Sequence, residues 1–340
     1  MFYISQAMNA ENPMTVAAGP MLPAREQIEA AASFLEPLVP PTPQYLWPQV
    51  VAAFGTEVWI KHENHTPIGA FKARSAATYF RRLMEREPTC PGVITATRGN
   101  HGQAVGLAAR RFKLPATVYV PRGNGVEKNA AMRALGVTLV EHGHDFQEAR
   151  EEAARVGAQR GLHTVPAFHL DIVLGVSTYW AELFRAVPGL DVVYVPIGQG
   201  SGACAAAAAR NAYSPRTRIV GVVSAQAPCF SRSFAARRVV EAPVETLLGD
   251  GMACRRPDQE ALDLVLANVS RIVEVTDSEL ADAMRRIFAM THNVAEGAGA
   301  AAFAAAWRER EALAGQRVAL TLTGGNVDTA LLAEVLAGRR

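Results

Sequence analysis

The chain has 340 residues, a length that suits about two domains and a large buried core. Hydrophobic residues make up 49% of it and charged residues 19%, a balance opposite to that of a disordered chain. The 34 Lys and Arg residues face 32 Asp and Glu residues, and a net charge of +2 argues against a protein that mainly neutralises the phosphates of nucleic acid. No run of about 18 uncharged apolar residues occurs, so a transmembrane helix is not expected.

The cysteines and the N-terminus narrow the class of protein further. The cysteines form no Cys-x-x-Cys pair and have no metal-ligand spacing from histidines, which excludes a disulfide scaffold and the usual zinc motifs; they are Cys90, Cys204, Cys229 and Cys254. Residues 1–20 lack a basic segment followed by an apolar one, so secretion is not expected and a cytoplasmic location is the default. We expect this stretch to form a loose arm, with Met8, Met14 and Met21 as alternative starts.

Strand-like and helix-like segments alternate along almost the whole chain. In order, we expect a strand at 58–60, a helix at 75–86, a strand at 93–96, a helix at 104–112, a strand at 116–120, a helix at 127–135, a strand at 137–140 and a helix at 146–159. There follow a strand at 192–196, a helix at 203–211, strands at 219–224 and 272–275, helices at 277–291 and 299–313, and a strand at 317–323. Such alternation predicts parallel sheets with helices on both faces.

Lys72 is the first candidate for chemistry. It follows Phe71 and precedes a run of small residues that leads into the helix expected at 75–86. A lysine near a helix start is unfavourable for the helix dipole, and the usual interpretation of a lysine is a solvated surface side chain. Here the neighbours are apolar and small, which favours a partly buried amine. Burial lowers the pKa of a lysine and makes it a usable base or imine-forming nucleophile.

Three glycine-containing turns each follow an expected strand. They are residues 97–103 (Thr-Arg-Gly-Asn-His-Gly-Gln), 196–202 (Pro-Ile-Gly-Gln-Gly-Ser-Gly) and 322–328 (Leu-Thr-Gly-Gly-Asn-Val-Asp). Each alone also suits an ordinary strand-end turn, and 196–202 matches neither the dinucleotide fingerprint nor the nucleotide-hydrolase loop. Together they supply an amide, a phosphate cup and a hydroxyl at the carboxyl ends of parallel strands. With a reactive lysine, these are the groups that pyridoxal 5′-phosphate (PLP) needs.

The four segments resemble, in order, the motifs of the fold-type II PLP enzymes, specifically the serine/threonine dehydratase and serine racemase group. Residues 71–76 (Phe-Lys-Ala-Arg-Ser-Ala) are similar to that family's Ser-Phe-Lys-x-Arg-Gly-Ala, and 99–103 match its Gly-Asn-His-Gly-Gln loop. Residues 196–202 resemble its glycine-rich phosphate cup, and 323–326 resemble its Ser-Gly-Gly-Asn. The resemblance spans roughly residues 40–328.

The resemblance implies a role for each matching residue. Lys72 is expected to be the Schiff-base lysine and the base that removes the Cα proton, with Phe71 against the cofactor ring, Asn100 on the ring's 3-oxygen and Thr323 facing the pyridine nitrogen. The residues expected to hold the phosphate are Gly198, Gln199, Gly200, Ser201 and Gly202. The residues expected around the substrate carboxylate are Thr97, Arg98, Gly99, Asn100 and His101. Gly251 and Glu296 match positions that line the family's cofactor pocket.

Two departures from the family pattern bear on the reaction. Arg98 stands where racemising members have a second serine, the base on the opposite face of the substrate, so we expect elimination without appreciable racemase activity. Ser224 stands where the family's divalent-metal site has an acid, and Pro228 and Phe230 follow where further ligands are expected, so we predict no structural magnesium.

Arg98 also has two interpretations of its own. Its guanidinium can bind an additional acidic group of the substrate, as in 3-hydroxyaspartate. Alternatively, it only strengthens the grip on the α-carboxylate or points to solvent.

The sequence thus predicts an α/β protein with the tryptophan synthase β-like fold of fold-type II PLP enzymes, two open parallel-sheet units with the cofactor in the cleft. We expect a large unit from residues 1–88 and 167–340 and a small one from 89–166. The expected reaction is dehydration and deamination of serine or threonine to an oxo acid and ammonia. A substituted substrate such as 3-hydroxyaspartate, an amino-acid racemase and a catalytically silent relative are the alternatives. The resemblance also implies a homodimer or larger oligomer and a catabolic form without a regulatory domain.

Overall fold

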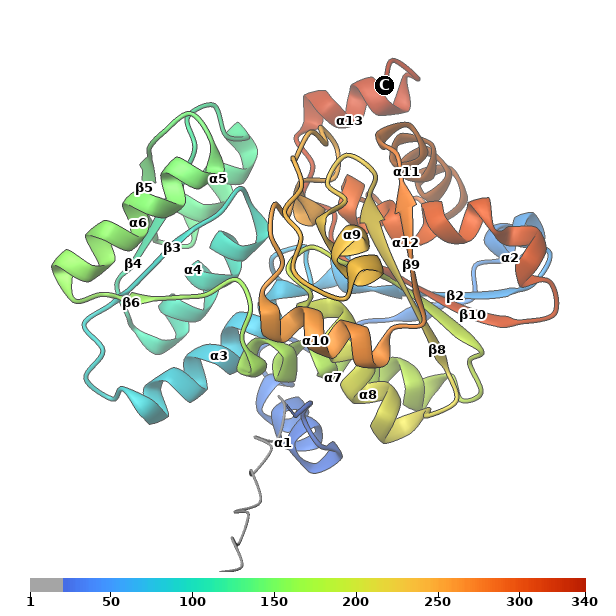
Figure 1. Cartoon of the computed structure of the whole chain (residues 1–340), viewed down its shortest axis with the longest axis horizontal. Helices are drawn as coiled ribbons and strands as arrows, with labels where there is room; N and C mark the ends of the chain where they lie inside the picture. The colour runs from blue at the N-terminus through green and yellow to red at the C-terminus, as the bar shows by residue number, and fades with distance from the viewer. Residues whose placement is uncertain (1–20) are drawn as a thin grey trace, which may run out of the picture.

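The computed structural model describes residues 21–340, so the predicted N-terminal arm and the first two alternative start sites, Met8 and Met14, lie outside the described residues. The described chain forms two lobes, each built on a sheet of its own (Figure 1). A six-stranded sheet carries one lobe and a four-stranded sheet the other.

The larger sheet has the strand order β1-β2-β10-β7-β8-β9. Its strands are β1 (Gln44–Tyr45), β2 (Glu57–His62), β7 (Val192–Pro196), β8 (Arg218–Ser224), β9 (Arg271–Val275) and β10 (Arg317–Leu322). All neighbouring strands pair in parallel except β1, a two-residue edge strand that pairs antiparallel with β2. The expected parallel sheet is therefore confirmed, with one short antiparallel edge added.

Alternate residues of these strands pack against two separate helical layers. Val193 of β7 faces the apolar cluster that includes helices α1, α7, α8 and α10, whereas Val192 and Tyr194 face the cluster formed with α2, α11 and α12. Successive side chains of a strand point to opposite faces of the sheet. A strand that is covered by helices on both faces therefore has a continuous run of apolar residues in its sequence. The helices of this lobe are α1 (Arg25–Leu35), α2 (Pro48–Phe54), α7 (Leu170–Ala186), α8 (Ser201–Tyr213), α9 (Cys229–Ala236), α10 (Gln259–Asn268), α11 (Asp277–Thr291), α12 (Gly297–Arg308) and α13 (Thr329–Leu336).

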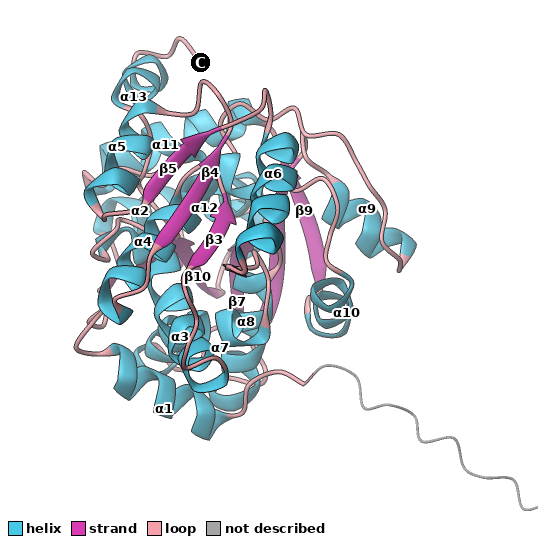
Figure 2. Ribbon diagram, turned by 90° about the vertical axis from the view of Figure 1, so that its left-hand side faces the viewer, coloured by secondary structure: helices cyan, strands magenta, loops and turns pink. Residues whose placement is uncertain are grey.

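The smaller sheet has the order β5-β4-β3-β6, and all of its strands are parallel. Its strands are β3 (Val93–Ala96), β4 (Ala116–Val120), β5 (Thr138–Glu141) and β6 (His163–Thr164). Helices α4 (Asn100–Phe112) and α5 (Val126–Ala134) lie on one side of it and α6 (Phe146–Arg160) on the other (Figure 2). Helix α3 (Lys72–Arg86) contributes Ala76, Phe80 and Leu83 to the core on the α4 side, so it links this lobe to the larger one.

Several helical segments differ from the sequence-based expectation. Helix α7 was not predicted from the sequence; it is buried along most of its length, with Tyr179 and Trp180 fully buried. Helices α1, α2, α9, α10 and α13 were not predicted either. The helix expected at 299–313 is instead α12, which ends at Arg308, followed by a short 3₁₀ helix, Arg310–Leu313.

Helix α3 is held in place by a buried group of four charged side chains. Arg74, two residues after Lys72, donates to Glu63 at 2.9 Å and to Glu182 of α7 at 2.6 Å. Lys61 of β2 donates to the same Glu182 at 2.6 Å. Two cations and two carboxylates balance each other, and Lys61, Glu63 and Arg74 are almost completely buried. This neutral group ties the first turn of α3 to β2 and α7.

Replacing Arg74 tests how much the fold depends on this group. Arg74→Met leaves the buried Glu63 without its cation, and breaking a buried pair in this way costs about 3–5 kcal/mol. Urea denaturation should show a loss of this size. Arg81→Met, on the exposed face of the same helix beside Glu85, should cost no more than about 1 kcal/mol. Equal losses in the two variants would contradict the assigned role of Arg74.

Candidate active site

Lys72 is the first residue of α3 and reaches into the space between the lobes. The backbone N–H of Phe71 donates to the carbonyl of Thr323 at 3.0 Å, which places the start of α3 against the end of β10. The ammonium of Lys72 lies 4.8 Å from the centre of the Phe71 ring. Part of the residue is accessible from the cleft, but protein surrounds its amine closely. Desolvation therefore lowers the pKa of Lys72 to about 8, although the charge of Glu296 raises it.

The loop before Lys72 pairs with the loop after β10. Gly325 donates its backbone N–H to the carbonyl of Gly69 at 3.0 Å, and the side chain of Asn326 donates to the carbonyl of Ile68 at 2.8 Å. Gly69 has a φ of +67°, and a Cβ built on it would lie 3.0 Å from Oδ1 of Asn326. A glycine suits this position because both the backbone conformation and the close approach disfavour a side chain.

Three polar side chains from distant parts of the chain form a hydrogen-bonded row beside this junction. Asn326 donates to Oδ1 of Asn100 at 2.7 Å, and Nδ2 of Asn100 donates to Glu296 at 2.6 Å. A carboxylate only accepts hydrogen bonds, so an ionised Glu296 requires the amide of Asn100 to point toward it. Burial raises the pKa of Glu296 to about 7, although Lys128 and Asn100 pull it down. The side-chain carboxyl of Glu296 is therefore expected to gain or lose a proton near neutral pH.

The turn after β3 places Asn100 and His101 on the same cleft. Thr97 Oγ1 accepts the backbone N–H of Gly99 at 3.1 Å, which shapes the turn before α4. Burial and the charge of Lys72 lower the pKa of His101 to about 3, so its ring is neutral. Nε2 of His101 is buried and has no partner among residues 21–340. Arg98, by contrast, is exposed.

The turn after β7 forms a cup of backbone groups. Gly200 has a φ of +97°, and α8 begins at the next residue, Ser201, which is buried. A Cβ built on Gly198 would lie 2.2 Å from the carbonyl oxygen of Gly251. The first N–H groups of a helix have no partner within the helix and carry partial positive charge, so this end of α8 suits a phosphate.

The structure brings the predicted segments together at the carboxyl ends of parallel strands from both sheets. Gly251 contacts the cup through Gly198, and a Cβ on Gly251 would lie 2.8 Å from the side chain of Ala298, two residues after Glu296. Lys72 is close enough to Glu296 and His101 for their pKa values to be coupled. Gln199 lies within the turn after β7, Gly202 is the second residue of α8, and Thr323 is buried directly after β10. Arg98 and Gly251 are the predicted site residues that are exposed in the described chain.

The sequence profile of the family described as pyridoxal-phosphate dependent enzymes matches residues 35–324. The chain belongs to this family. Pyridoxal phosphate is therefore its cofactor, and the protein is an enzyme of the fold-type II group.

Its relatives include ammonia-lyases of hydroxy amino acids. The chain is 32% identical over 283 residues to an L-threonine ammonia-lyase of Thermotoga maritima, covering 83% of this chain and 70% of the relative. It is 31% identical over 309 residues to an L-threo-3-hydroxyaspartate ammonia-lyase of a Pseudomonas species, covering 91% and 97% of the two chains. The structure of the processed form of threonine deaminase isoform 2 from Solanum lycopersicum matches with a TM-score of 0.85 and 25% identity, covering 97% and 99%.

The residues present fit pyridoxal phosphate on grounds of their own chemistry. A lysine with a lowered pKa opens one helix, and the turn before α8, where Gly198 packs too closely against Gly251 to carry a side chain, offers backbone N–H groups. The buried Nε2 of His101 has no protein partner in residues 21–340, as expected for a group that meets a bound molecule.

Other kinds of site find less support in the described chain. Among residues 21–340, no group of three His, Cys, Asp or Glu side chains is placed to hold a metal ion, and Ser224 bonds instead with Gln226 at 3.1 Å and 3.3 Å. The absence of structural magnesium stays a prediction.

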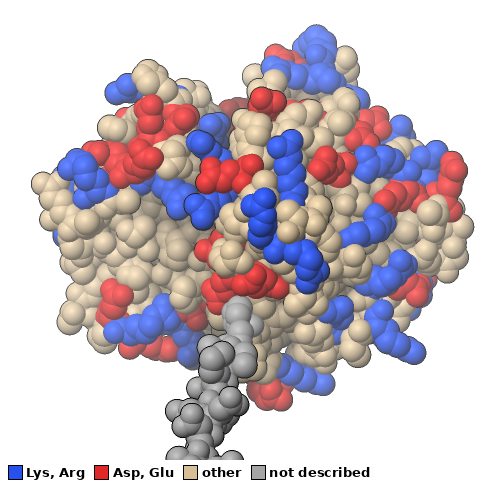
Figure 3. Space-filling view, in the orientation of Figure 1, with Lys and Arg blue, Asp and Glu red and all other residues tan. Residues whose placement is uncertain are grey.

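No helix within residues 21–340 is long and apolar enough to cross a membrane. Acidic and basic side chains are mixed over the face in Figure 3.

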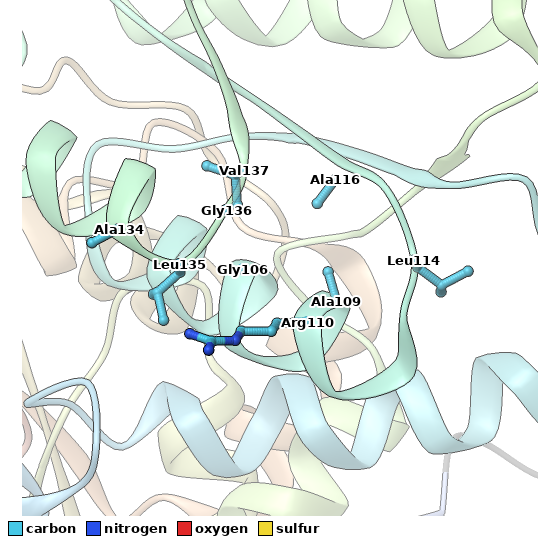
Figure 4. A pocket seen from close by; sticks show the side chains of 9 residues that line it. All are labelled: Gly106, Ala109, Arg110, Leu114, Ala116, Ala134, Leu135, Gly136 and Val137. Carbon is cyan, nitrogen blue, oxygen red and sulfur yellow. The ribbon is translucent and has the colours of Figure 1, made fainter.

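A pocket of about 310 Å³ in the smaller lobe is separate from the site. Figure 4 shows it between the C-terminal part of α4, with Ala109 and Arg110, and the turn that follows α5, with Leu135 and Gly136. At 1.5 Å per residue, Ala109 lies about 13 Å along the helix from Asn100. The pocket therefore opens at the opposite end of α4 from the cleft.

Two residues of the site were missed by the sequence analysis. Asn326 stands inside the glycine-rich turn 322–328 but was given no role, although its side chain links Ile68 to Asn100. Lys128, near the start of α5, bonds to Asp250 at 3.0 Å across the cleft, and nothing in its local sequence distinguishes it from a solvated lysine. The first could have been found from the motif, the second only from the fold.

The cup predicts a difference between two of its glycines. In Gly198→Ala the new methyl group meets the backbone of Gly251, and such overpacking costs about 1–3 kcal/mol unless the turn shifts. A shifted turn holds the phosphate less well, so affinity for pyridoxal phosphate should fall, by at most roughly 150-fold. Gly202→Ala should bind normally, because a Cβ there would make only ordinary contacts, at 3.5 Å or more. Fluorescence titration of the apoenzyme with pyridoxal phosphate measures the affinity of both variants. Equal affinities would contradict the assignment of residues 198–202 as the phosphate cup.

Proposed function

We propose that the enzyme eliminates water from a 3-hydroxy amino acid and releases an oxo acid and ammonia, with serine or threonine as the default substrate. The observation that carries the proposal is the lysine of lowered pKa at the start of α3, close to Glu296 and His101, in a fold that also offers a glycine-rich turn at the start of α8. When bound, pyridoxal phosphate supplies an electron sink that stabilises negative charge at the substrate's Cα. The similarity to ammonia-lyases of threonine and 3-hydroxyaspartate supports the same reaction class.

Lys72 holds the cofactor and moves the proton in this proposal. A pKa of about 8 leaves a useful fraction of the amine uncharged near neutral pH, and the free amine is both the nucleophile and the base. Its position beside the ring of Phe71 keeps the amine within a confined, partly apolar space. Lys72 takes the proton from Cα, and the hydroxide leaves from Cβ.

The remaining residues orient the cofactor and the substrate. Residues 198–202 would hold the phosphate, and Asn100, fixed in orientation by Glu296 and Asn326, would offer its amide to the ring's 3-oxygen. Thr323, buried directly after β10, would offer a neutral hydroxyl to the ring nitrogen. A neutral partner there would leave the cofactor a weaker electron sink than an acidic one, which suits elimination.

The turn at 97–101 is proposed to hold the substrate carboxylate. Its backbone N–H groups precede and open α4, where an anion is favoured. The neutral ring of His101 adds a polar group with free capacity. Arg98 occupies the place where a second base is needed for racemisation, so we propose that elimination dominates.

3-Hydroxyaspartate is the second candidate substrate. Arg98 is exposed at the rim of the site and makes no hydrogen bond or ion pair with residues 21–340, so its guanidinium is free for a second carboxylate. A relative that acts on L-threo-3-hydroxyaspartate covers 91% of this chain.

We further propose that the enzyme forms a homodimer or a larger oligomer, that it acts in the cytoplasm, and that it holds no structural magnesium.

Oxo-acid release across a panel of β-hydroxy amino acids tests the proposed reaction. The wild-type holoenzyme should release oxo acid and ammonia in equal amounts from at least one of serine, threonine and 3-hydroxyaspartate. Lys72→Ala should lose about 10²- to 10⁴-fold in turnover together with the visible absorption of the bound cofactor. Racemisation of serine at a rate comparable to oxo-acid release would overturn the proposal.

The Arg98→Ser variant separates the two candidate substrates. Loss of a charge-assisted hydrogen bond costs about 1.5–3 kcal/mol, so kcat/KM for 3-hydroxyaspartate should fall roughly 10- to 150-fold while that for serine changes little. Arg111→Ser, exposed toward the other end of α4, is the matched control and should leave both substrates unchanged. An equal loss for all substrates would mean that Arg98 serves only the α-carboxylate.

A further inference from the structure

The connection between α11 and α12, residues 292–296, carries Glu296 into the site. It has no regular secondary structure, and it leaves α11 through His292, whose φ of +53° lies in the left-handed region. This conformation is unfavourable for a residue other than glycine, so contacts beyond the turn have to hold the connection in its course. At its far end, Glu296 donates its backbone N–H to the carbonyl of Gly324 at 3.1 Å and accepts the amide of Asn100 at 2.6 Å.

Asn293 fastens the near end of this connection. Its Nδ2 donates to the carbonyl of Thr291 at 2.9 Å, and its backbone N–H donates to Oγ1 of Thr291 at 3.2 Å. A carbonyl only accepts hydrogen bonds, so the amide has one orientation and its Oδ1 faces the other way. There Oδ1 lies 2.8 Å from Nε2 of His65 and 3.3 Å from Nδ2 of Asn64, and both of these donate to it. Asn293 thus ties the connection to the 3₁₀ helix Glu63–His65, directly after β2.

His65 is exposed, but its ring is held in place by the buried ring of His62. The two rings stack with their centres 5.0 Å apart and their planes 28° from parallel. His62 is completely buried, and its Nε2 lies 3.0 Å from Nε1 of Trp47. An indole N–H only donates, so Nε2 of His62 accepts and the ring is neutral, with its proton on Nδ1. The donor that Asn293 needs therefore sits on a ring that is packed against a fixed, uncharged support.

The connection also packs against the glycine turn that follows β10. A Cβ built on Gly325 would lie 2.8 Å from the carbonyl oxygen of Val294 and 3.7 Å from Cβ of Asn64. The backbone N–H of Gly325 donates to the carbonyl of Gly69, in the loop that leads to α3. These segments are in direct contact, so a shift of the connection is passed both to Glu296 and to the turn.

We propose that Asn293 is a positioning residue that fixes the connection 292–296 against the end of β2 and thereby sets the place where the Glu296 carboxylate meets the amide of Asn100. It acts through Glu296 and Asn100 and not by its own contact with the cofactor. The inference rests on the proposed function in one respect, the assignment of Asn100 to the cofactor's 3-oxygen. When Asn293 is truncated, the connection shifts, the bond between Glu296 and Asn100 loosens, and Asn100 serves the 3-oxygen less well.

The visible absorption of the holoenzyme and its affinity for pyridoxal phosphate test the proposal. The absorption band of the cofactor depends on hydrogen bonds to its 3-oxygen, so Asn293→Ala should shift this band. Titration of the apoenzyme should show an affinity lower by roughly 3- to 10-fold, the effect of a weakened neutral hydrogen bond. A wild-type band and a wild-type affinity in Asn293→Ala would overturn the proposal.

Asn268→Ala is the matched control, because Asn268 is an asparagine at a helix end that is bonded in the same two ways. It accepts from Arg210 at 3.2 Å and donates to the carbonyl of Leu264 at 2.9 Å, at the end of α10. Asn268→Ala should lose a similar amount of stability in urea denaturation and leave the band and the affinity unchanged. The same shift of the band in both variants would mean that it reports only a loss of stability, and this would also overturn the proposal.

Two further variants keep the test decisive. His65→Phe keeps an aromatic ring stacked on His62 but removes the donor, so it should shift the band in the same direction, and it replaces Asn293→Ala should the latter fail to fold. Asn100→Ala removes the proposed contact with the 3-oxygen itself. A shift in Asn100→Ala without one in Asn293→Ala would overturn this inference and leave the proposed function standing. Shifts in both variants, with no release of oxo acid from any substrate by the wild-type enzyme, would overturn the proposed function and leave this inference standing.

Discussion

The pairing of the loop before Lys72 with the loop after β10 is the contact on which the site depends. Strands β2 and β10 are parallel neighbours whose register sets Thr321 beside Lys61 and Leu322 beside His62, so both strands end at the same edge. The backbone bond from Phe71 to Thr323 then places Lys72 at that edge, although these two partners are far apart in the sequence. Asn326 bonds to this junction at Ile68 and also to Asn100, which bonds in turn to Glu296. The junction therefore contacts the polar row of the site directly.

The protein buries charge in two different ways, with different consequences. Around Arg74 the charges cancel within hydrogen-bonding distance, which suits a group that holds elements together. Around Lys72 and Glu296 the cancellation is incomplete, so burial shifts the pKa of both toward neutrality. Groups that titrate near neutral pH serve proton transfer, and Lys72 and Arg74 lie only two residues apart on α3. The balanced charges around Arg74 hold the start of α3 in place, and this fixes the position of Lys72.

The fold could be predicted from local patterns wherever one face of an element differs from the other or where a short apolar run follows a turn. The strands at 93–96 and 192–196 agree with β3 and β7, and the helix at 277–291 agrees with α11, whose capping box at Thr276 and Glu279 is visible in the sequence. Helix α7 was not predicted, although it is buried along most of its length. Its Glu182 supports Arg74, a contact between segments far apart in the chain that no local pattern indicates.

The sequence by itself determined which residue types are available for the chemistry: a lysine before a helix, three turns rich in glycine, and an arginine where a second base is otherwise expected. Their order along the chain was enough to indicate the family and its cofactor. Only the tertiary structure decided that burial raises the pKa of Glu296 to about 7 and that Lys128 reaches Asp250 of the other lobe. The physical reason is that burial and the distance between charges set these properties, and both are fixed by packing between segments far apart in the chain.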